Sequence, residues 1–544
     1  MASSCLNLAK SFLEKPAISA FDKLNQRNRF CSSLMGFPVW KCNGRIVCCH
    51  AKGQVRTPNG QSSPAVADDN LIFSKSNEDF HMLDLVSSKG ANGSTTLIGF
   101  EAGIGIASFL RGKTFFITGA TGFLAKVLIE KILRTAPDVG KIYVLVKAKS
   151  KEAALDRLKS EIVYAELFRS LQEIHGNTYQ EFMLRKLVPV TGDVREANMG
   201  IESALAEEIS EEVHVIVNSA ASTTFDERYD VAMNINTIGP FRLMSFAKRF
   251  KRLKLFLTSV DRQGRVMERS FCMGDTISKE LASPDFSADS MPILDIETEI
   301  RLAFSSTKAF DDSLLVKQMK DLGLQRMMDP IVLYYGKGQL TGFPADPKGV
   351  IDVIPADMVV NATLAAMAKH GWAMEPGINT YHIASSTVNP LVIQKLCRLL
   401  YKYFNSSPFM DSKGMPIEVP QMKLFDDINK FYTYVESNVM QQMSSHEKMS
   451  QQLNKICTML VEQAKHLANL YEPYTFYSGR FDNTNTQRLI VEMSEEEKRE
   501  FSFDVGGIDW EDYITNIHIP GLRRHVMKGR GMCGSGSQLV TTQL

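Results

Sequence analysis

The sequence lacks the long apolar run that a membrane-spanning helix requires, since no stretch approaches about 18 apolar residues. It also lacks a strong excess of either charge, because its formal net charge is +1, and this argues against a nucleic-acid-binding protein. Its nine cysteines and ten histidines fall in no ligand spacing, so neither a metal site nor a disulfide framework is predicted. The 544 residues, 44% hydrophobic and 23% charged, instead predict a soluble, intracellular protein of roughly two to four domains.

The first sixty residues differ from the rest in charge. They contain nine Lys or Arg but only two acids, Glu14 and Asp22, and they hold five of the nine cysteines. A basic, acid-poor and hydroxyl-containing start is typical of an organelle transit peptide, so residues 1–60 predict a plastid address. A basic tail without an address is the alternative. We expect residues 61–110 to form a linker and residues 529–544 a disordered tail.

A strand, a glycine turn and a helix follow one another from residue 113. The apolar run 113–119 ends at Gly119, and a helical pattern then continues toward Pro137. Gly119 permits a tight turn, Gly122 lets the backbone approach a pyrophosphate, and Ala125 lets the helix pack closely on the strand. In this setting the turn predicts a dinucleotide site with the anion at the helix N-terminus. A tight turn without a ligand is the alternative.

The second strand, residues 141–147, indicates which dinucleotide binds. An NAD site usually carries an acidic residue near the end of this strand, where it holds the ribose 2′-hydroxyl. Here Lys147, Lys149 and Lys151 stand in its place. Lysines suit a 2′-phosphate, so we predict NADPH rather than NADH. The alternative is that these lysines only lie at a solvent-exposed strand end and bind no cofactor.

Three further apolar runs are predicted to be strands of the same sheet: 187–193, 213–221 and 253–259. Asp193 ends the first where an adenine ring could lie, and small residues end the second. The repeated alternation of strands and helices predicts an α/β fold with a doubly wound, parallel, Rossmann-type sheet and its ligand at the strand C-termini. The predicted cofactor-binding residues are Thr118, Gly119, Thr121, Gly122, Phe123, Leu124, Lys147, Asp193, Asn218 and Ala220.

The motifs at 118–124, 190–193 and 218–221 together resemble the extended short-chain dehydrogenase/reductase family. More narrowly, residues about 100–528 resemble the plant alcohol-forming fatty acyl reductases of the male-sterility type. The stretches that carry this narrower resemblance are 329–342, 352–361, 471–477, 479–485, 510–516 and 520–524.

The resemblance implies a reaction and a domain order. Family members use two NADPH to reduce a long-chain acyl-CoA or acyl-ACP through an aldehyde to a primary alcohol. Male-sterility-type members are plastid proteins that supply fatty alcohol for sporopollenin of the pollen exine, and related members supply wax. Residues 111–384 would form the NADPH-binding reductase domain. Residues 385–528 would form a helical C-terminal domain that helps enclose the acyl chain. Chain length, CoA versus ACP as donor, and oligomeric state stay open.

The C-terminal third carries an apolar pattern at helical spacing that includes Leu460, Ala464 and Leu467. The pattern predicts a helix that stops before Pro473. Such a stripe is typical of a core, and a contact of this part with a membrane surface stays open as an alternative.

The residues that the family uses for catalysis are missing. In the family a Tyr donates the proton, and a Lys four residues later on the same helix lowers the pKa of that Tyr. The only Tyr–Lys pair at this spacing is Tyr143 and Lys147, which lies in a predicted strand, so we reject it. Ser259 is the remaining candidate catalytic residue, as a hydroxyl at the end of the fifth strand.

Two internal deletions explain this loss. Segments resembling 321–326 and 327–330 are fused here, whereas family members carry a strand and helix between them, a unit of roughly 30 residues. A smaller gap follows near Ser259. The sharp boundaries favour a splice-level or gene-model cause, in which case the active product is longer. The alternative is an inactive chain that binds nucleotide or an intact paralogue.

Overall fold

The computed structural model describes residues 103–222, 229–258, 268, 329–374, 377–411, 413–444, 451–476 and 479–527. The predicted transit peptide, most of the predicted linker, Ser259, both predicted deletion points and the predicted C-terminal tail lie outside these residues.

A five-stranded, all-parallel sheet forms the centre of the N-terminal half, in the order β3-β2-β1-β4-β5. In chain order, β2 and β3 are added on one side of β1, and β4 and β5 are then added on its other side. The carboxyl ends of β1 and β4 therefore meet at the point where the strand order reverses, which is where ligands bind in open α/β sheets. The predicted doubly wound fold is confirmed. The strands are β1 (Phe115–Thr118), β2 (Ile142–Val146), β3 (Leu187–Thr191), β4 (Val215–Asn218) and β5 (Leu255–Thr258).

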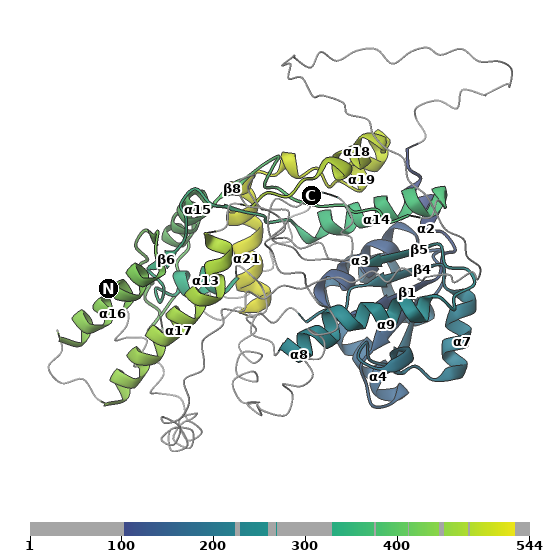
Figure 1. Cartoon of the computed structure of the whole chain (residues 1–544), viewed down its shortest axis with the longest axis horizontal. Helices are drawn as coiled ribbons and strands as arrows, with labels where there is room; N and C mark the ends of the chain where they lie inside the picture. The colour runs from purple at the N-terminus through teal and green to yellow at the C-terminus, as the bar shows by residue number, and fades with distance from the viewer. Residues whose placement is uncertain are drawn as a thin grey trace, which may run out of the picture. The chain divides into compact units, whose positions relative to one another are not determined.

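Helices cover both faces of this sheet because successive strand residues alternate between two apolar cores. Phe115 and Ile117 of β1 pack with α3 and α14, whereas Phe116 packs with α7 and α9. Figure 1 shows the strands with α14 above them and α9 below. The covering helices are α3 (Phe123–Thr135), α7 (Ser203–Glu212), α9 (Ile238–Ala247) and α14 (Ala356–Ala373).

The strand β5 is less well covered than its neighbours. All four residues of β1 and of β4 are buried, whereas three residues of β5 are half-buried and Thr258 is exposed. Within the part of the chain that is described, no strand pairs with the outer edge of β5. A parallel sheet normally extends or is covered at such an edge.

The predicted linker boundary at residue 110 lies too late. Residues 106–110 form α2 (Ile106–Leu110), whose Ile106, Phe109 and Leu110 are completely buried against the sheet-covering helices. Phe109 also fills the space beside Gly371 of α14, where a Cβ would approach its ring to 2.2 Å. The apolar residues among the glycines at 103–110 could have indicated in the sequence that this segment is buried.

Part of the C-terminal half packs on the nucleotide-binding core. Met493, Phe501 and Phe503 are buried in the same cluster as α3 and α14. The carboxylate of Glu497 in α19 (Glu495–Glu500) accepts hydrogen bonds from three consecutive backbone N–H groups, those of residues 104–106, at 2.7–2.9 Å. Segments near the two ends of the described chain are thus joined by a partly buried polar contact and a shared core.

A second group of elements is mainly helical, as predicted for the C-terminal part. Its two apolar cores centre on Trp510 and on Phe431, and α16 and α17 lie side by side (Figure 1). The elements are α13 (Asp329–Gly336), β6 (Gly342–Pro344), β7 (Val350–Ile351), β8 (Leu391–Val392), α15 (Ile393–Ser406), β9 (Lys423–Phe425), α16 (Ile428–Ser444), α17 (Gln451–Thr475) and α20 (Trp510–Asp512). By contrast, α18 (Thr484–Glu492) packs on the core of α3 and α14 through Leu489.

The predicted stop before Pro473 is wrong, because α17 continues to Thr475. Proline removes only one backbone hydrogen bond there, and the position is within the last turn. One local and one tertiary hydrogen bond hold this last turn: the Thr475 hydroxyl donates to the Tyr471 carbonyl at 3.2 Å, and the Thr475 carbonyl accepts from the distant Asp346 N–H at 3.0 Å.

Candidate cofactor site

The glycine turn after β1 has the geometry that a bound dinucleotide requires. Gly119 has a φ of +67°, and a Cβ there would lie 2.6 Å from the carbonyl group of Ser219, so only glycine fits. The Gly122 N–H donates to the Gly119 carbonyl at 2.8 Å and closes the turn, and Gly122 is the N-cap of α3. The N-terminal end of α3, with its N–H groups and positive dipole end, is suited to a pyrophosphate.

The other predicted residues of the turn lie around that helix start. Phe123 is half-exposed, Leu124 and Thr121 are partly buried, and Ala125 is buried against the sheet. The close packing of Ala125 matches the role expected for the third small residue of the motif.

A series of hydrogen bonds, of which the one between Thr118 and Asn218 is buried, links the carboxyl ends of three neighbouring strands. The Thr118 hydroxyl donates to Asn218 Oδ1 at 2.7 Å, and Asn218 Nδ2 donates to the Thr258 hydroxyl at 3.2 Å. The same Thr118 hydroxyl accepts from the Ala220 N–H at 3.2 Å. Because each side chain has a partner, this series fixes the strand ends and the small residues after β4, against which a nicotinamide ring would rest.

Asp193, predicted to lie near an adenine ring, is held by two cations. Arg195 donates to both carboxylate oxygens at 2.7–3.1 Å, and Lys147 Nζ lies 3.3 Å from Oδ2. Burial would raise the pKa of Asp193, but the hydrogen bonds from Arg195 and the charge of Lys147 outweigh burial and lower the pKa to about 2. The carboxylate is therefore ionised at neutral pH and keeps both cations at the end of β2.

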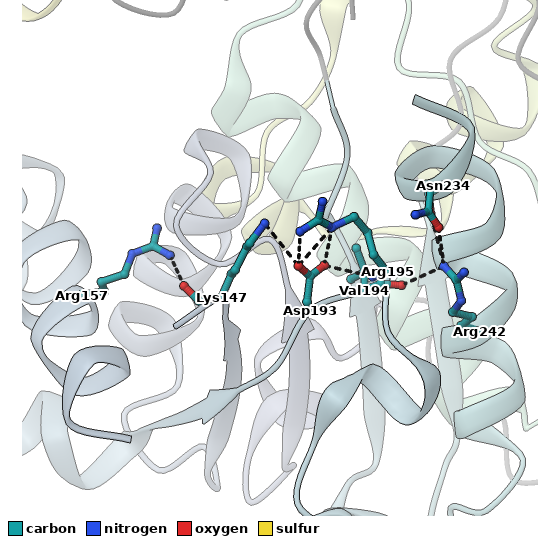
Figure 2. Close-up of polar contacts among 7 residues, drawn as sticks. All are labelled: Lys147, Arg157, Asp193, Val194, Arg195, Asn234 and Arg242. Carbon is teal, nitrogen blue, oxygen red and sulfur yellow. Dashed lines mark hydrogen bonds and ion pairs between the residues drawn. The ribbon is translucent and has the colours of Figure 1, made fainter. Parts of the chain in front are cut away.

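Two further arginines hold the backbone around this cluster (Figure 2). Arg157, from α4 (Lys151–Leu158), donates to the Lys147 carbonyl at 2.6 Å. Arg242 of α9 donates to Asn234 Oδ1 at 2.8 Å and to the Val194 carbonyl at 3.5 Å. The loops after β2 and β3 are thus fixed from both sides, and the cluster presents a positive face at the carboxyl edge of the sheet.

An asparagine fixes the loop after β4 in a similar way. Asn236 accepts from the Ser222 N–H at 2.7 Å and donates to the Ser222 carbonyl at 2.9 Å. It lies in a π-helical turn, Met233–Thr237, and such turns occur frequently at functional sites.

Sequence reasoning missed Arg157, Arg195, Asn236 and Arg242 as site residues. Arg195 had a signal, because it is a cation two positions after a predicted site carboxylate. In the sequence, Arg157 and Arg242 cannot be told from other charged residues on exposed helix faces. The pairing of Asn236 with residue 222 depends on the path of the chain between them.

None of the described tyrosines whose pKa is shifted has it lowered. Every tyrosine whose pKa departs from its ordinary value there has it raised, with burial as the largest cause in each. A Tyr activated by a neighbouring Lys needs the opposite shift. Tyr143 donates to Glu208 at 2.8 Å at one end of β2, whereas Lys147 pairs with Asp193 beyond the other end, which agrees with rejecting this pair. The catalytic candidate Ser259 lies outside the described residues.

Glu268 is a buried carboxylate that joins two loops of the C-terminal half. It accepts from the His382 N–H at 2.6 Å and from the Thr486 hydroxyl at 2.8 Å, and also from the N–H groups of Asn485 and Thr486. Only 8% of Glu268 is exposed. The chain that follows β5 is therefore fastened to the start of α18.

We expect Glu268→Ala to lower the free energy of unfolding by about 2–4 kcal/mol, because it leaves several buried N–H and O–H donors unsatisfied. Urea denaturation measures the loss. Glu495→Ala is the matched control, since that glutamate is 85% exposed, and it should change the free energy by less than about 0.5 kcal/mol. Equal effects of both substitutions would contradict a stabilising role for the buried contact.

Comparison with known proteins agrees with this geometry. The family described as "Male sterility protein" matches twice, with an NAD-binding part over residues 117–325 and a second part over 445–529. The chain is 51% identical to "Fatty acyl-CoA reductase 2, chloroplastic" of Arabidopsis thaliana, over 86% of this chain and 87% of that protein. It is 30% identical to "Alcohol-forming fatty acyl-CoA reductase" of Simmondsia chinensis, over 78% of this chain and 99% of that protein.

Among solved structures, the terminal R domain of the myxalamid PKS-NRPS pathway is similar at a TM-score of 0.45 and 16% identity. The match covers 77% of this chain and 93% of that one, and it is too distant to bear on function.

The alignment with the Arabidopsis protein also shows that this chain has fewer residues than its relative over the matched region. It runs over 546 positions, whereas 86% of 544 residues is about 468, so about 78 positions hold a residue of the relative and none of this chain. One strand-and-helix unit is roughly 30 residues, so the deficit is larger than one such unit.

Within the described ranges, no helix is both long and apolar enough to cross a membrane. The paired family matches, the high identity over most of both chains, and the parallel sheet with its glycine turn lead to one conclusion: the chain belongs to the family of alcohol-forming fatty acyl-CoA reductases.

Proposed function

We propose that this chain has the framework of an NADPH-dependent reductase that converts a long-chain acyl-CoA or acyl-ACP to a primary alcohol through an aldehyde. The single observation that supports NADPH is the pair of cations, Lys147 and Arg195, at the end of β2 where an NAD site has an acid. Family membership supports the reduction of an acyl thioester to an alcohol.

The residues present fit the cofactor at three places. Gly122 has no side chain, so a pyrophosphate can approach the backbone of the turn there, and Gly119 lets the turn pack against Ser219. The N-terminus of α3 can bind the phosphates, and Lys147 with Arg195 can bind a 2′-phosphate. Asp193 holds these two cations in place, because both of its carboxylate oxygens are engaged by Arg195 and one of them also by Lys147.

NADPH would supply a hydride to the acyl carbonyl in each of the two reductions, one equivalent for each step. This chain would have to orient the ring and protonate the oxygen that becomes negative. The hydrogen-bonded chain from Thr118 through Asn218 to Thr258 keeps the strand ends rigid for the first task. The second task needs an acid close to the carbonyl, and the family's Tyr–Lys pair is absent from the sequence.

We expect Lys147→Ala to weaken NADPH binding about 10-fold and to leave NADH binding within about 2-fold. The reason is that a charge-assisted hydrogen bond to the 2′-phosphate is lost, whereas NADH has no such phosphate. Isothermal titration of the full chain with each cofactor measures both values.

Lys430→Ala is the matched control, because Lys430 is also exposed and also ion-paired with an aspartate, Asp426. It should leave both cofactors unaffected. If Lys147→Ala weakened NADPH and NADH equally, the proposed preference for the 2′-phosphate would be wrong.

A second function is favoured by the alignment deficit. A chain that has no residue at about 78 aligned positions of its relative, and no Tyr–Lys pair at helical spacing outside β2, would bind nucleotide or associate with an intact paralogue without turnover. The partly exposed outer edge of β5 supports this candidate, because no strand among the described residues pairs with it and such an edge can accept another chain.

We further propose a plastid location and a role in sporopollenin or wax synthesis. The basic, acid-poor residues 1–60 support the location, and the relative named chloroplastic is 51% identical. Fluorescence of the full chain with a C-terminal fluorescent protein should coincide with plastids, and the signal should become diffuse when residues 1–60 are removed.

A further inference from the structure

A compact group of basic and apolar side chains lies at the amino ends of three strands. Residue 113 precedes β1, residue 214 directly precedes β4, and residue 254 directly precedes β5. The candidate cofactor site lies at the opposite, carboxyl edge of the same strands. The group, named here the amino-edge patch, consists of Lys113, His214, Arg252, Lys254, Trp372 and Met374.

Trp372 is fixed at one side of the patch. Its ring meets that of Phe109 edge-on at 5.6 Å, and its indole N–H donates to the Gly105 carbonyl at 3.4 Å. Lys113 Nζ lies 5.9 Å from the Trp372 ring centre and 5.4 Å from that of Phe109. The indole is nevertheless 53% exposed, so an anchored aromatic ring stands at the surface beside a cation.

Met374 closes the patch on the other side. Lys254 Nζ contacts Met374 Sδ at 3.3 Å, and the methionine is 64% exposed at the end of α14. His214 lies between the two lysines, because its Nδ1 accepts from the Thr114 N–H at 3.1 Å and its carbonyl accepts from the Lys254 N–H at 2.8 Å. Burial lowers the pKa of His214, and the charges of Lys113, Arg252 and Lys254 lower it further.

The positive charge of the patch is only partly balanced by its surroundings. Arg252 lies near Glu212, which Lys141 also contacts, so its charge is partly offset. Arg111, next to the patch, is paired with Asp138 at 3.7 Å. Lys113 and Lys254 form no ion pair with any residue that the structure describes.

We propose that the amino-edge patch binds the surface of a bilayer that contains anionic lipid. A bilayer surface offers negative headgroups directly above apolar chains, which is the combination that exposed Trp372 and Met374 beside Lys113 and Lys254 would meet. Tryptophan is suited to this boundary, since its ring is apolar and its N–H is polar. Lysine can place its charge among the headgroups while its stem stays among apolar groups.

This orientation leaves the cofactor edge free. The patch is at the amino ends of the strands, so a bound bilayer would not cover the carboxyl ends where NADPH and the thioester are expected. A soluble thioester could then enter from one side while the protein is retained at a membrane. Binding of the patch to a bilayer does not require turnover, so it can be tested separately from the proposed reaction.

Tryptophan fluorescence tests the contact directly. The chain has three tryptophans, and Trp510 is only 1% exposed, so a Trp40→Phe variant of the full chain leaves Trp372 as the reporter at the surface. Vesicles of brominated phosphatidylglycerol with phosphatidylcholine should quench the exposed component of its emission. Brominated phosphatidylcholine alone should quench it much less. Trp40→Phe/Trp372→Phe should lose the lipid-dependent quenching, which assigns the signal to the patch.

A charge variant provides the second measurement. Lys113→Gln/Lys254→Gln should raise the lipid concentration needed for half-maximal quenching about 10- to 30-fold, because each charge near an anionic surface contributes about 5-fold. Lys402→Gln/Lys430→Gln removes the same charge from the helical region and should leave that concentration unchanged. The basic residues 1–60 are common to all variants and so do not affect the comparison.

Three results would overturn the proposal. One is an absence of quenching by the anionic vesicles, and another is equal quenching of both charge variants. The third is shielding of Trp372 that depends on protein concentration and not on lipid, which would mean that a second copy of this chain occupies the patch.

Discussion

The chain as written is expected to bind NADPH and to form no detectable fatty alcohol from a C16 acyl thioester. Restoring the family's segment between Arg326 and Met327, together with the residues missing near Ser259, is expected to raise turnover by at least about 1,000-fold. A positioned general acid contributes about 10²–10⁴ in rate, and the restored strand would also cover the β5 edge. Product analysis by mass spectrometry, with NADPH and the thioester supplied, measures the effect.

A control separates the acid from the repaired fold. The restored chain with its inserted Tyr replaced by Phe should fold like the restored chain and bind NADPH, yet form little alcohol. Alcohol formation by the chain as written would contradict the prediction, because it would mean that another group protonates the carbonyl oxygen.

The second large effect is expected for Gly119→Ala. We expect it to reduce the free energy of unfolding by about 3–5 kcal/mol and to abolish NADPH binding. The φ of +67° costs an L-residue about 1–2 kcal/mol, and the new Cβ would also lie 2.6–2.7 Å from the backbone of Ser219 and Ala220. That backbone cannot move away easily, since the Ala220 N–H is bonded to Thr118 and β4 is buried.

Gly112→Ala is the matched control for the strain alone. Gly112 has a φ of +65°, and no atom lies within 4 Å of the place where its Cβ would be. Urea denaturation should therefore show a loss of about 1–2 kcal/mol for Gly112→Ala, with NADPH binding retained. Similar losses for both variants would mean that the close approach of Ser219 to Gly119 does not contribute.

Local sequence was sufficient for the elements of the sheet. Each of the five predicted strands contains the observed one and extends at most three residues beyond it, because short runs of β-branched and aromatic residues between turns leave few alternatives. The glycine turn was predictable for the same reason, since only glycine tolerates the backbone angle at residue 119.

Helix limits were less predictable where tertiary contacts decide them. The Pro473 signal predicted an end that the hydrogen bonds of Thr475 override. The sequence predicts a linker at α2, because five residues are too few to show a helical period of apolar residues. The stability of this short helix comes from burial of Phe109.

By itself the sequence determined the order of strands and helices, the glycine turn, the basic end of β2 and the absence of a Tyr–Lys pair. These depend on local backbone preferences and on residue identity, which can be read along the chain. Only the tertiary structure decided that Arg195 and Lys147 share the carboxylate of Asp193, and that Glu268 and Glu497 join distant segments. It also decided that Lys113, Lys254, Trp372 and Met374 meet at one edge. Apart from the pairing of Arg195 with Asp193, such contacts join residues tens to hundreds of positions apart, and the tertiary fold, not local preference, brings them together.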